Sequence, residues 1–447
     1  MSIFDKWISQ FTFSLSERVV EQLRMMRTTV DYRSGRQPPQ LRVKPNQADD
    51  NLTVNFCGLI VDRAVSSMLG DGVKFDLPGE NESTESQYID ALWNANRKQV
   101  LLHAAAMTAA DYGTGYIKIL PDGVIGKDGR IYPRLVVLTP SLVTVDTMPD
   151  DKDLIIRYRI EYQIEGVDGK PMVRRETHEL NEAGTWNVIT DERRSLGNWT
   201  RVDEKVWPYD FPQIIHWQNL PNPYDVQGDP ELTEDVLTLQ DRLNYTASNE
   251  SKIIRLYAHP MRYGKGLGNN DKLQVGPDEM PNVSQSASIE QLDSVGDLPG
   301  VNGFVHFLRQ SLFDIARTVD IDSLQDKLGA LTNFALRVLY ADNLSKIETK
   351  RLLFGEALLE LNRRLLVMAG MNPDPGEIVW PDILPTNEQE QVLYITSDLA
   401  NGLVSKQTAS KRRGYNYEDE QERMEGEAVA GDNVGAALLR AFSGGQQ

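Results

Sequence analysis

Histidine is the side chain through which this sequence could most readily hold a catalytic metal. Five histidines occur, at positions 103, 178, 216, 259 and 306. None is paired at the spacing that two zinc ligands on one helix or turn require. His178-Glu179 begins like a zinc-protease motif, but Glu182 stands where the second histidine would be. The histidines therefore predict no metal centre.

Two groups of aspartates carry the oxygen ligands that Mg²⁺ prefers. One group follows Pro149 and the other follows a predicted helix: Asp150, Asp151 and Asp153, and Asp320, Asp322 and Asp326. Solvated loops explain both groups better than a metal site does.

Nucleophilic and phosphate-binding motifs are equally weak. Gly264-Lys265-Gly266 lacks the Lys-Ser/Thr ending and the strand-to-helix context of a phosphate-binding loop, and it indicates a surface loop. No Gly-x-Ser-x-Gly elbow occurs, and the single cysteine, Cys57, lies in an apolar helical pattern where a buried, inert thiol is expected. Catalysis would rest on carboxylates alone, so we predict a protein that is not an enzyme and takes no cofactor.

Composition limits the remaining classes of function. The 447 residues exceed what one core usually holds, so several subdomains are expected. The formal net charge of -18 is the opposite of the basic footprint of a tight DNA-binding protein. One cysteine fits a reducing cytoplasm. No apolar run reaches the roughly 18 to 20 residues of a membrane span, and Asp5 and Lys6 stand where a signal peptide would be apolar, so we expect neither insertion nor secretion.

The first half of the chain reads as helices followed by strands. Apolar spacing and glycine breaks predict the following order: a helix to Val30, a loop at Gly35–Pro39, a helix over Asn51–Gly70, a strand over Val73–Leu77, a helix over Tyr88–Asp111, a strand over Tyr116–Leu120, and a β-rich block over Leu135–Trp217 with strands at Leu154–Ile164 and Val206–Trp217. Turns are expected at Asp168-Gly169 and Gly197-Asn198.

The second half reads as mainly helical. Asp229 is suited to cap a helix and Pro230 to its first turn, with Leu232, Val236, Leu239 and Leu243 as a buried stripe of a helix that ends near Tyr257. A loop-rich insertion over His259–Gly296 follows this helix. Further helices are predicted over Val301–Thr318, Thr332–Ala369, Glu388–Ala400 and Lys406–Arg413. At about 1.5 Å per residue the helix from Thr332 would run roughly 55 Å.

A series of short motifs occupies nearly two thirds of the chain in a fixed order. They are Asn55-Phe56-Cys57-Gly58-Leu59-Ile60-Val61-Asp62 with Gly70-Asp71-Gly72-Val73, Asp111-Tyr112-Gly113-Thr114-Gly115, Leu138-Thr139-Pro140-Ser141, Phe211–Asn219 before Gly228-Asp229-Pro230-Glu231, Leu239–Ser248 with Asp241 and Asn244, and Gly329–Arg337. In this order they resemble the portal proteins of tailed bacteriophages, particularly those of long-tailed phages. The last motif departs from the family pattern, because Thr332-Asn333-Phe334 stands where a Ser-Gly pair is usual.

The resemblance implies an α+β, mainly helical portal fold. Its expected parts are an α/β wing (1–228), a stem helix (229–257), a loop- and strand-rich clip (258–296), a second stem helix (297–318), a tunnel-loop region (319–334), a long wing helix with a connector (335–384), and a crown of C-terminal helices with a mobile tail (385–447). It further implies a ring of about twelve copies around a channel that carries double-stranded DNA into and out of the capsid.

Candidate site residues follow from these expected parts. The tunnel loop would place Asp320, Asp322, Gln325, Asp326 and Lys327 beside DNA. Lys252 and Arg255 on the first stem helix are candidates for the channel wall, although an exposed helix face carries charges in any case. Arg262, Tyr263 and Lys265 in the clip are candidates for docking, with an ordinary turn into a strand as the competing interpretation. A channel of like charge repels DNA and lets it slide, which makes the acidic composition intelligible.

The implied partners are those of a portal vertex. They are other copies of the chain, double-stranded DNA held transiently and without sequence preference, the terminase motor, the major capsid and scaffolding proteins, and a head-completion adaptor. The expected location is the virion, after assembly in the host cytoplasm. Two rivals stay open: another head structural protein, such as an adaptor or minor capsid subunit, and a metal-dependent nuclease or ATPase of the packaging machine.

Overall fold

The computed structural model describes residues 17–45, 48–78, 83–166, 168–194, 197–258, 262–265, 288–291, 299–320, 333–383, 388–413, 417, 420–421 and 423–424. The chain divides into two compact units, Met1–Pro381 and Asp382–Gln447. Helices and β-sheets both contribute to the described part, which confirms the predicted α+β class.

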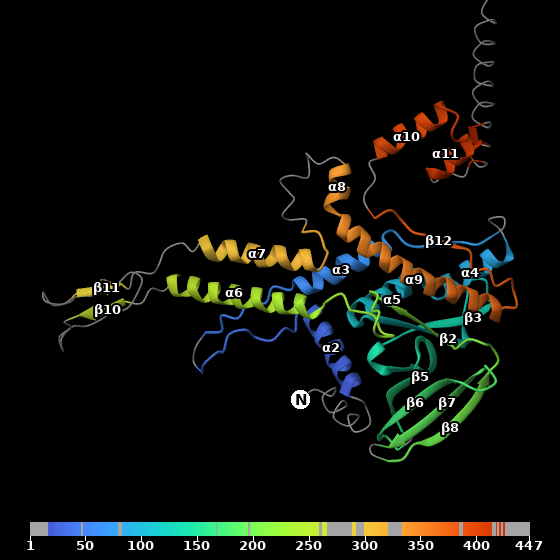
Figure 1. The fold of residues 1–447 in the computed structure, drawn as a ribbon, viewed down its shortest axis with the longest axis horizontal. Helices are drawn as coiled ribbons and strands as arrows, with labels where there is room; N and C mark the ends of the chain where they lie inside the picture. The colour runs from blue at the N-terminus through green and yellow to red at the C-terminus, as the bar shows by residue number, and fades with distance from the viewer. Residues whose placement is uncertain are drawn as a thin grey trace, which may run out of the picture. The chain divides into compact units, whose positions relative to one another are not determined.

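A three-stranded antiparallel sheet lies at the centre of the first unit (Figure 1). β2 (Thr114–Ile125) pairs with β3 (Ile131–Leu138) on one side and with β9 (Ile214–Gln218) on the other. Successive side chains of a strand point to opposite faces. Ile117 and Ile119 therefore share one buried face of β2, and Tyr116 takes the other.

Five more strands form a separate antiparallel meander, in which each strand pairs with the next along the chain. They are β4 (Val143–Met148), β5 (Asp151–Glu165), β6 (Pro171–Leu180), β7 (Trp186–Arg194) and β8 (Thr200–Trp207). Their apolar face packs against the Tyr116 face of the central sheet, in a core that includes Tyr158, Ile160, Trp186 and Ile214. The two turns predicted within this block are confirmed.

Several helices of the first unit lie near the central sheet (Figure 1). They are α2 (Glu17–Arg33), α3 (Phe56–Leu69), α4 (Thr84–Ala95), α5 (Lys98–Tyr112) and α9 (Ala341–Met368). β1 (Lys74–Asp76) pairs with β12 (Glu377–Val379) beside them. Asn55 caps α3 by accepting a hydrogen bond from the backbone N–H of Gly58 at 3.1 Å. Cys57 follows it and is fully buried, as the apolar pattern predicted.

Two long helices carry the insertion of the second half. α6 (Glu234–Ala258) and α7 (Pro299–Ile315) lie side by side (Figure 1). They are antiparallel, because Leu239 near the start of α6 and Ile315 at the end of α7 line one hollow. Between them along the chain, β10 (Arg262–Lys265) pairs with β11 (Ser288–Gln291). The prediction of short strands between two helices is confirmed, and the predicted loops lie outside the described residues.

The single helix predicted over residues 88–111 is wrong. Two helices occupy this stretch, and Arg97 between them adopts a left-handed conformation with φ of 55°. The side chain of Asn96 donates to the carbonyl of Pro133 at 2.9 Å and accepts from the N–H of Leu135 at 2.8 Å. These bonds to β3 fix the break, a tertiary constraint that apolar spacing does not reveal.

The long helix predicted over residues 332–369 is also interrupted. α8 (Asn333–Leu339) ends before Tyr340, where the backbone leaves helical geometry, and α9 begins at Ala341. α9 has 28 residues and is therefore about 42 Å long rather than 55 Å. The interruption lets the first turns of α9 contact the end of α7, where Asn343 donates to the carbonyl of Arg317.

Two further boundaries differ from the sequence prediction. α6 begins at Glu234 rather than after Asp229, because backbone bonds hold the intervening residues: the N–H of Asp229 donates to Leu220 and that of Glu231 donates to Ala110. The apolar run Val206–Trp217 is not one strand. Its ends belong to β8 and β9, in different sheets, and the segment between them crosses from one sheet to the other.

The second unit contains two short helices, α10 (Glu388–Ala400) and α11 (Lys406–Arg412), close to the predicted bounds. Gly402, with φ of 68°, turns the chain after α10. Ser405 caps α11 by accepting from the N–H of Thr408 at 3.2 Å. Leu393, Tyr394 and Leu403 of this unit are exposed.

Gly115 provides a test of how closely the central sheet packs. A Cβ at this position would lie 2.1 Å from the ring of Trp217 on β9, whereas a Cβ at Gly303 in α7 meets nothing within 4 Å. We expect Gly115→Ala to lower the free energy of unfolding by about 1–3 kcal/mol through overpacking. Gly303→Ala should raise it by up to about 1 kcal/mol through helix propensity. Urea titrations of both variants measure the two effects, and equal changes would contradict this packing.

Candidate functional site

Two of the described residues for which the sequence suggested a functional role, Lys252 and Arg255, lie on α6 of the α6–α7 pair. One side of α6 is anchored by buried polar side chains spaced four residues apart. Gln240 donates to the carbonyl of Val54 at 2.6 Å, and Asn244 accepts from the N–H of Val54 at 3.0 Å. Ser248 accepts from the N–H of Leu52 at 2.9 Å. The extended segment before α3 is thereby attached along α6.

Asp241 adds a charged anchor to the same helix. The hydroxyl of Tyr32, on α2, donates to its carboxylate at 2.8 Å, and the amide of Gln40 donates to it at 3.0 Å. Burial, reinforced by the bond to Asp241, raises the pKa of Tyr32 well above its usual value, so this hydroxyl stays a donor. Asp241 therefore joins α6 to α2 and to the loop that follows it.

A buried ion cluster lies where the chain enters α6. Glu231 is buried together with Lys346 and Lys350, which stand one turn apart on α9. Lys350 donates to one carboxylate oxygen of Glu231 at 2.9 Å, and Lys346 pairs with the other. Burial pushes the pKa of Glu231 upward, but the charges of Lys350 and Lys346 outweigh it and hold that pKa at about 2. Glu231 is therefore ionised throughout the physiological range.

The residues that follow α7 are held by two other elements and by α7 itself. Lys346 on α9 donates to the carbonyl of Ala316 at 2.6 Å, and Arg63 on α3 donates to that of Val319 at 2.8 Å. Arg309, six residues before the end of α7, pairs with Asp320 at 2.7 Å. Asp320 is thus part of a fixed platform, from which the chain continues into residues 321–332.

The two basic residues expected on the channel wall differ in their surroundings. Arg255 forms a bidentate pair with Asp50, with N–O distances of 2.6 and 2.7 Å. Its side-chain bond to Asp50 raises the pKa of Arg255 and lowers that of Asp50. Lys252, three residues earlier on α6, is exposed. Arg255 therefore has a structural partner, and Lys252 is accessible to a ligand.

The docking candidates lie on the β10–β11 hairpin. Arg262 stands opposite Gln291 in its register, Tyr263 opposite Glu290, and Lys265 opposite Ser288. Lys265 is exposed. The remaining tunnel-loop candidates, Asp322, Gln325, Asp326 and Lys327, lie outside the described residues.

In the described residues, no cluster of three His, Cys, Asp or Glu side chains could hold a metal ion. Neither the His178-Glu179 motif nor the aspartates after Pro149 therefore form a metal site there. Asp150, Asp151 and Asp153 are exposed, as predicted, but Asp151 and Asp153 lie in β5 rather than in a loop. His178 is buried against Glu176 at 2.5 Å, and burial lowers its pKa. No helix among these residues is long and apolar enough to cross a membrane.

Comparison with known proteins identifies the family. A sequence model of phage portal proteins, described as SPP1 Gp6-like, matches residues 25–431, which is nearly the whole chain. The chain belongs to this portal family. The resemblance carried by the ordered motifs is thereby confirmed.

Other comparisons are more distant. No curated protein matches the sequence. Among solved structures, a chain from the "Neck of native GTA particle computed with C12 symmetry" aligns with a TM-score of 0.46 and 13% identity. The alignment covers 80% of this chain and 89% of that one.

The residues that position α6 and α7 in this portal protein are largely ones that sequence reasoning missed. The motifs drew attention to Asp241 and Asn244, but the ion cluster was not foreseen. A signal for it exists, because Lys346 and Lys350 recur at helical spacing inside an apolar stripe, where unpaired lysines are costly. Their partner lies 115 residues away from Lys346, in a segment without periodicity, so the sequence could not supply it.

The ion cluster predicts a defined effect on stability. Glu231→Gln leaves two buried lysines without a counter-charge, and we expect a loss of about 3–5 kcal/mol in the free energy of unfolding. Glu234→Gln, at an exposed position three residues later, is the matched control and should change it by less than about 0.5 kcal/mol.

Comparing the wild type with Glu231→Gln at different pH values tests the charge of Glu231. The folded-state pKa of Glu231, about 2, is depressed below the ordinary value of 4.5, so its contribution is present above pH 4.5 and is lost as pH falls toward 2. The difference in unfolding free energy between the wild type and Glu231→Gln should therefore shrink over that interval. A difference independent of pH would contradict the ionised cluster.

Proposed function

We propose that copies of this chain assemble into a ring of about twelve around a channel for double-stranded DNA, which passes through it into the phage capsid and out again. The observation that carries the proposal is the family match over residues 25–431. The role is that of a structural protein of the virion rather than an enzyme, assembled in the host cytoplasm.

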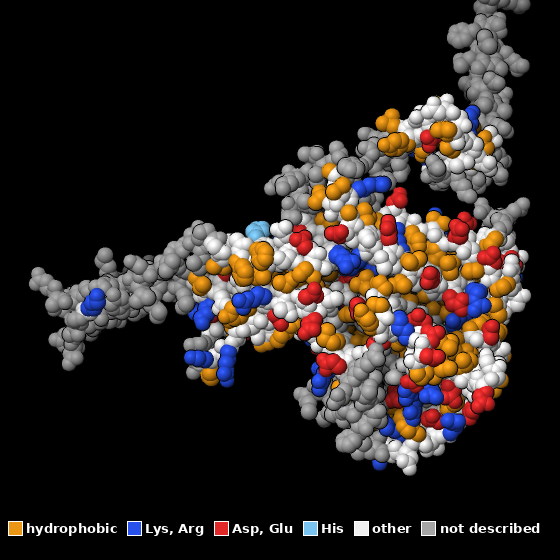
Figure 2. Space-filling view, in the orientation of Figure 1, with side chains coloured by type: hydrophobic (Ala, Val, Ile, Leu, Met, Phe, Trp, Pro, Cys, Tyr) orange, Lys and Arg blue, Asp and Glu red, His pale blue; other side chains and the backbone are white. Residues whose placement is uncertain are grey.

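The α6–α7 pair is the proposed stem of this ring. Its exposed surface supports the assignment, because Ile254 is 61% exposed, Phe304 42% and Phe307 60%. Apolar side chains of this size gain free energy when a neighbouring chain covers them. Apolar side chains are visible along this part of the molecule (Figure 2). The wing would be the α/β part, and α10 and α11 would belong to the crown.

The electrostatics suit a passage that does not grip its cargo. The chain has a formal charge of -18, and Arg255 on the proposed stem is engaged by Asp50. DNA affinity grows with the number of phosphates that Lys and Arg neutralise, so few accessible cations leave DNA free to slide. Lys252 would centre the strand, and the segment 320–331, with Asp320, Asp322, Gln325, Asp326 and Lys327, would form the constriction.

The segment 258–296 is the proposed clip, with Arg262, Tyr263 and Lys265 as docking residues. Terminase would bind there during packaging, and a head-completion adaptor would bind afterwards. The wing and crown would face the major capsid and scaffolding proteins. The described β10–β11 hairpin supports a clip built around strands.

Electron microscopy of the purified chain tests the ring directly. We expect closed rings with a central hole at micromolar concentration, and native mass spectrometry should give one dominant subunit number near twelve. A chain that stays monomeric at high concentration, across salt and pH conditions, would overturn the proposal.

The role of Lys252 is tested on assembled rings. We expect Lys252→Glu to weaken binding of short DNA duplexes and to flatten its dependence on salt, because fewer phosphates are neutralised. Lys170→Glu, at an exposed turn of the five-stranded sheet, makes the same charge change away from the channel and should leave both unchanged. Identical effects of the two variants would remove Lys252 from the channel wall.

A further inference from the structure

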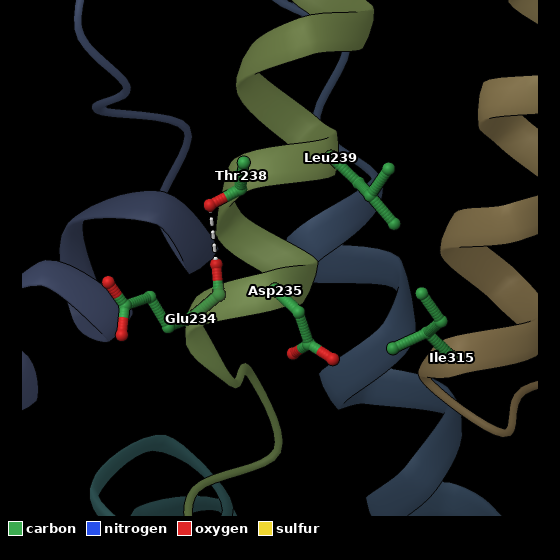
Figure 3. A pocket seen from close by; sticks show the side chains of 5 residues that line it. All are labelled: Glu234, Asp235, Thr238, Leu239 and Ile315. Carbon is green, nitrogen blue, oxygen red and sulfur yellow. Dashed lines mark hydrogen bonds between the residues drawn. The ribbon is translucent and has the colours of Figure 1, made fainter.

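A shallow hollow lies between the start of α6 and the end of α7. It measures about 670 Å³ and is lined by Glu234, Asp235, Thr238, Leu239 and Ile315. Asp235, Leu239 and Ile315 point into the space between the two helices (Figure 3). Ile315 is 45% exposed although it is apolar. The space between the helices thus has an apolar floor with the acidic side chain of Asp235 at one end, whereas Glu234 points to the other side of α6 (Figure 3).

The hollow continues an apolar flank of α7. Phe304, Phe307 and Ile315 are spaced three and eight residues apart, which places them along one side of the helix. The rings of Phe304 and Phe307 stack with centroids 6.3 Å apart, and both rings are exposed. The neighbouring flank, with Asn302, His306 and Gln310, is polar. One side of α7 is therefore suited to contact protein.

The end of α8 has the complementary composition. Val338 is 60% exposed and Leu339 46%, and Arg337 before them is exposed as well. An apolar pair preceded by a cation matches an apolar floor with the acidic side chain of Asp235 at its end, in both apolar character and charge.

Within one copy, the end of α8 lies close to the hollow at the end of α7. Asn343, near the start of α9, donates to the carbonyl of Arg317, two residues beyond Ile315. Tyr340, the residue after Leu339, accepts from the N–H of Leu344 in that same turn of α9. α8 therefore ends beside the end of α7. Rotation about a ring axis keeps every residue at its own height, so the α8 end of one copy stays level with the hollow of the next.

We propose that the hollow receives the α8 end of a neighbouring copy, with Val338 and Leu339 on Leu239 and Ile315, and with Arg337 facing Asp235. The contact is head-to-tail, because two different surfaces meet, and such contacts generate a ring when the rotation between successive copies closes. The inference rests on the proposed ring and specifies which surfaces join its subunits. It connects the start of the stem of one copy to the segment that follows residues 320–332 of the next.

Cysteine cross-linking between separately labelled copies tests the contact. Ile315→Cys and Val338→Cys are prepared as single variants, mixed before assembly and oxidised. Cys57 can stay, because it is fully buried and burial raises its thiol pKa to about 12. A disulfide requires Cα atoms about 4.4–6.8 Å apart, so a covalent dimer in the mixture reports direct contact between copies. The double variant should give a ladder of covalent multimers up to the ring size.

Val206→Cys mixed with Ile315→Cys is the control, because Val206 is 67% exposed on β8. Rings that form without dimers above this control would overturn the contact and leave the proposed function standing. A cross-link that appears only within single chains of the double variant would also overturn it. Failure of the unmodified chain to form rings would instead count against the proposed function.

A charge exchange provides a second readout without cysteines. Asp235→Arg and Arg337→Glu should each raise the concentration for half-maximal assembly by about two- to five-fold, as expected for an exposed ion pair. The double variant Asp235→Arg with Arg337→Glu should return it toward the wild-type value. Effects that add in the double variant would overturn the pairing, since a charge change that only weakens the fold has no reason to be rescued.

Discussion

The buried cluster of Glu231 with Lys346 and Lys350 is the constraint on which the arrangement of α6, α7 and α9 depends. Removing two ammonium groups and a carboxylate from water is costly, and only close pairing compensates for it. Glu231 precedes α6, its backbone N–H donates to the end of α5, and Lys346 also donates to the carbonyl of Ala316, the residue after α7. One cluster therefore fixes the start of one proposed stem helix and the end of the other against the same turn of α9.

The two ends of the α6–α7 pair are held by different interactions. At the cluster, charges and backbone carbonyls fix the helices to α3, α5 and α9. Further out, α6 is attached by neutral side chains to the extended segment before α3, and then by Arg255 to Asp50. Beyond Arg255 the helix ends and the β10–β11 hairpin follows. The arrangement suits a pair of helices rigidly mounted at one end that presents a separate binding element at the other.

Much of the fold could be predicted from the sequence because its signals are local. Apolar spacing located α3, α6, α7, α10 and α11, and turn residues located two hairpins of the five-stranded sheet, β5–β6 and β7–β8. The errors share one cause, since each boundary is set by a distant partner. Asn96 bonding to β3 divides α4 from α5, the contact of α9 with the end of α7 accompanies the break at Tyr340, and backbone bonds to Leu220 and Ala110 delay the start of α6. Of the candidate site, the sequence supplied the helices and their exposed Lys252 but not the pairing of Arg255 or Asp320.

Several arginines of the described residues are paired with carboxylates, which bears on the proposed role of this acidic chain as a DNA conduit. On the five-stranded sheet Arg157 and Arg159 share Asp146, Arg174 pairs with Glu192 and Arg201 with Asp191, and acidic and basic side chains interleave over these strands (Figure 2). Arg309 and Arg255 on the proposed stem are likewise occupied. A guanidinium held by a carboxylate adds little to the attraction for phosphate, because the pair is close to neutral. These paired arginines thus stabilise the fold itself, which agrees with the proposed passage that does not grip DNA.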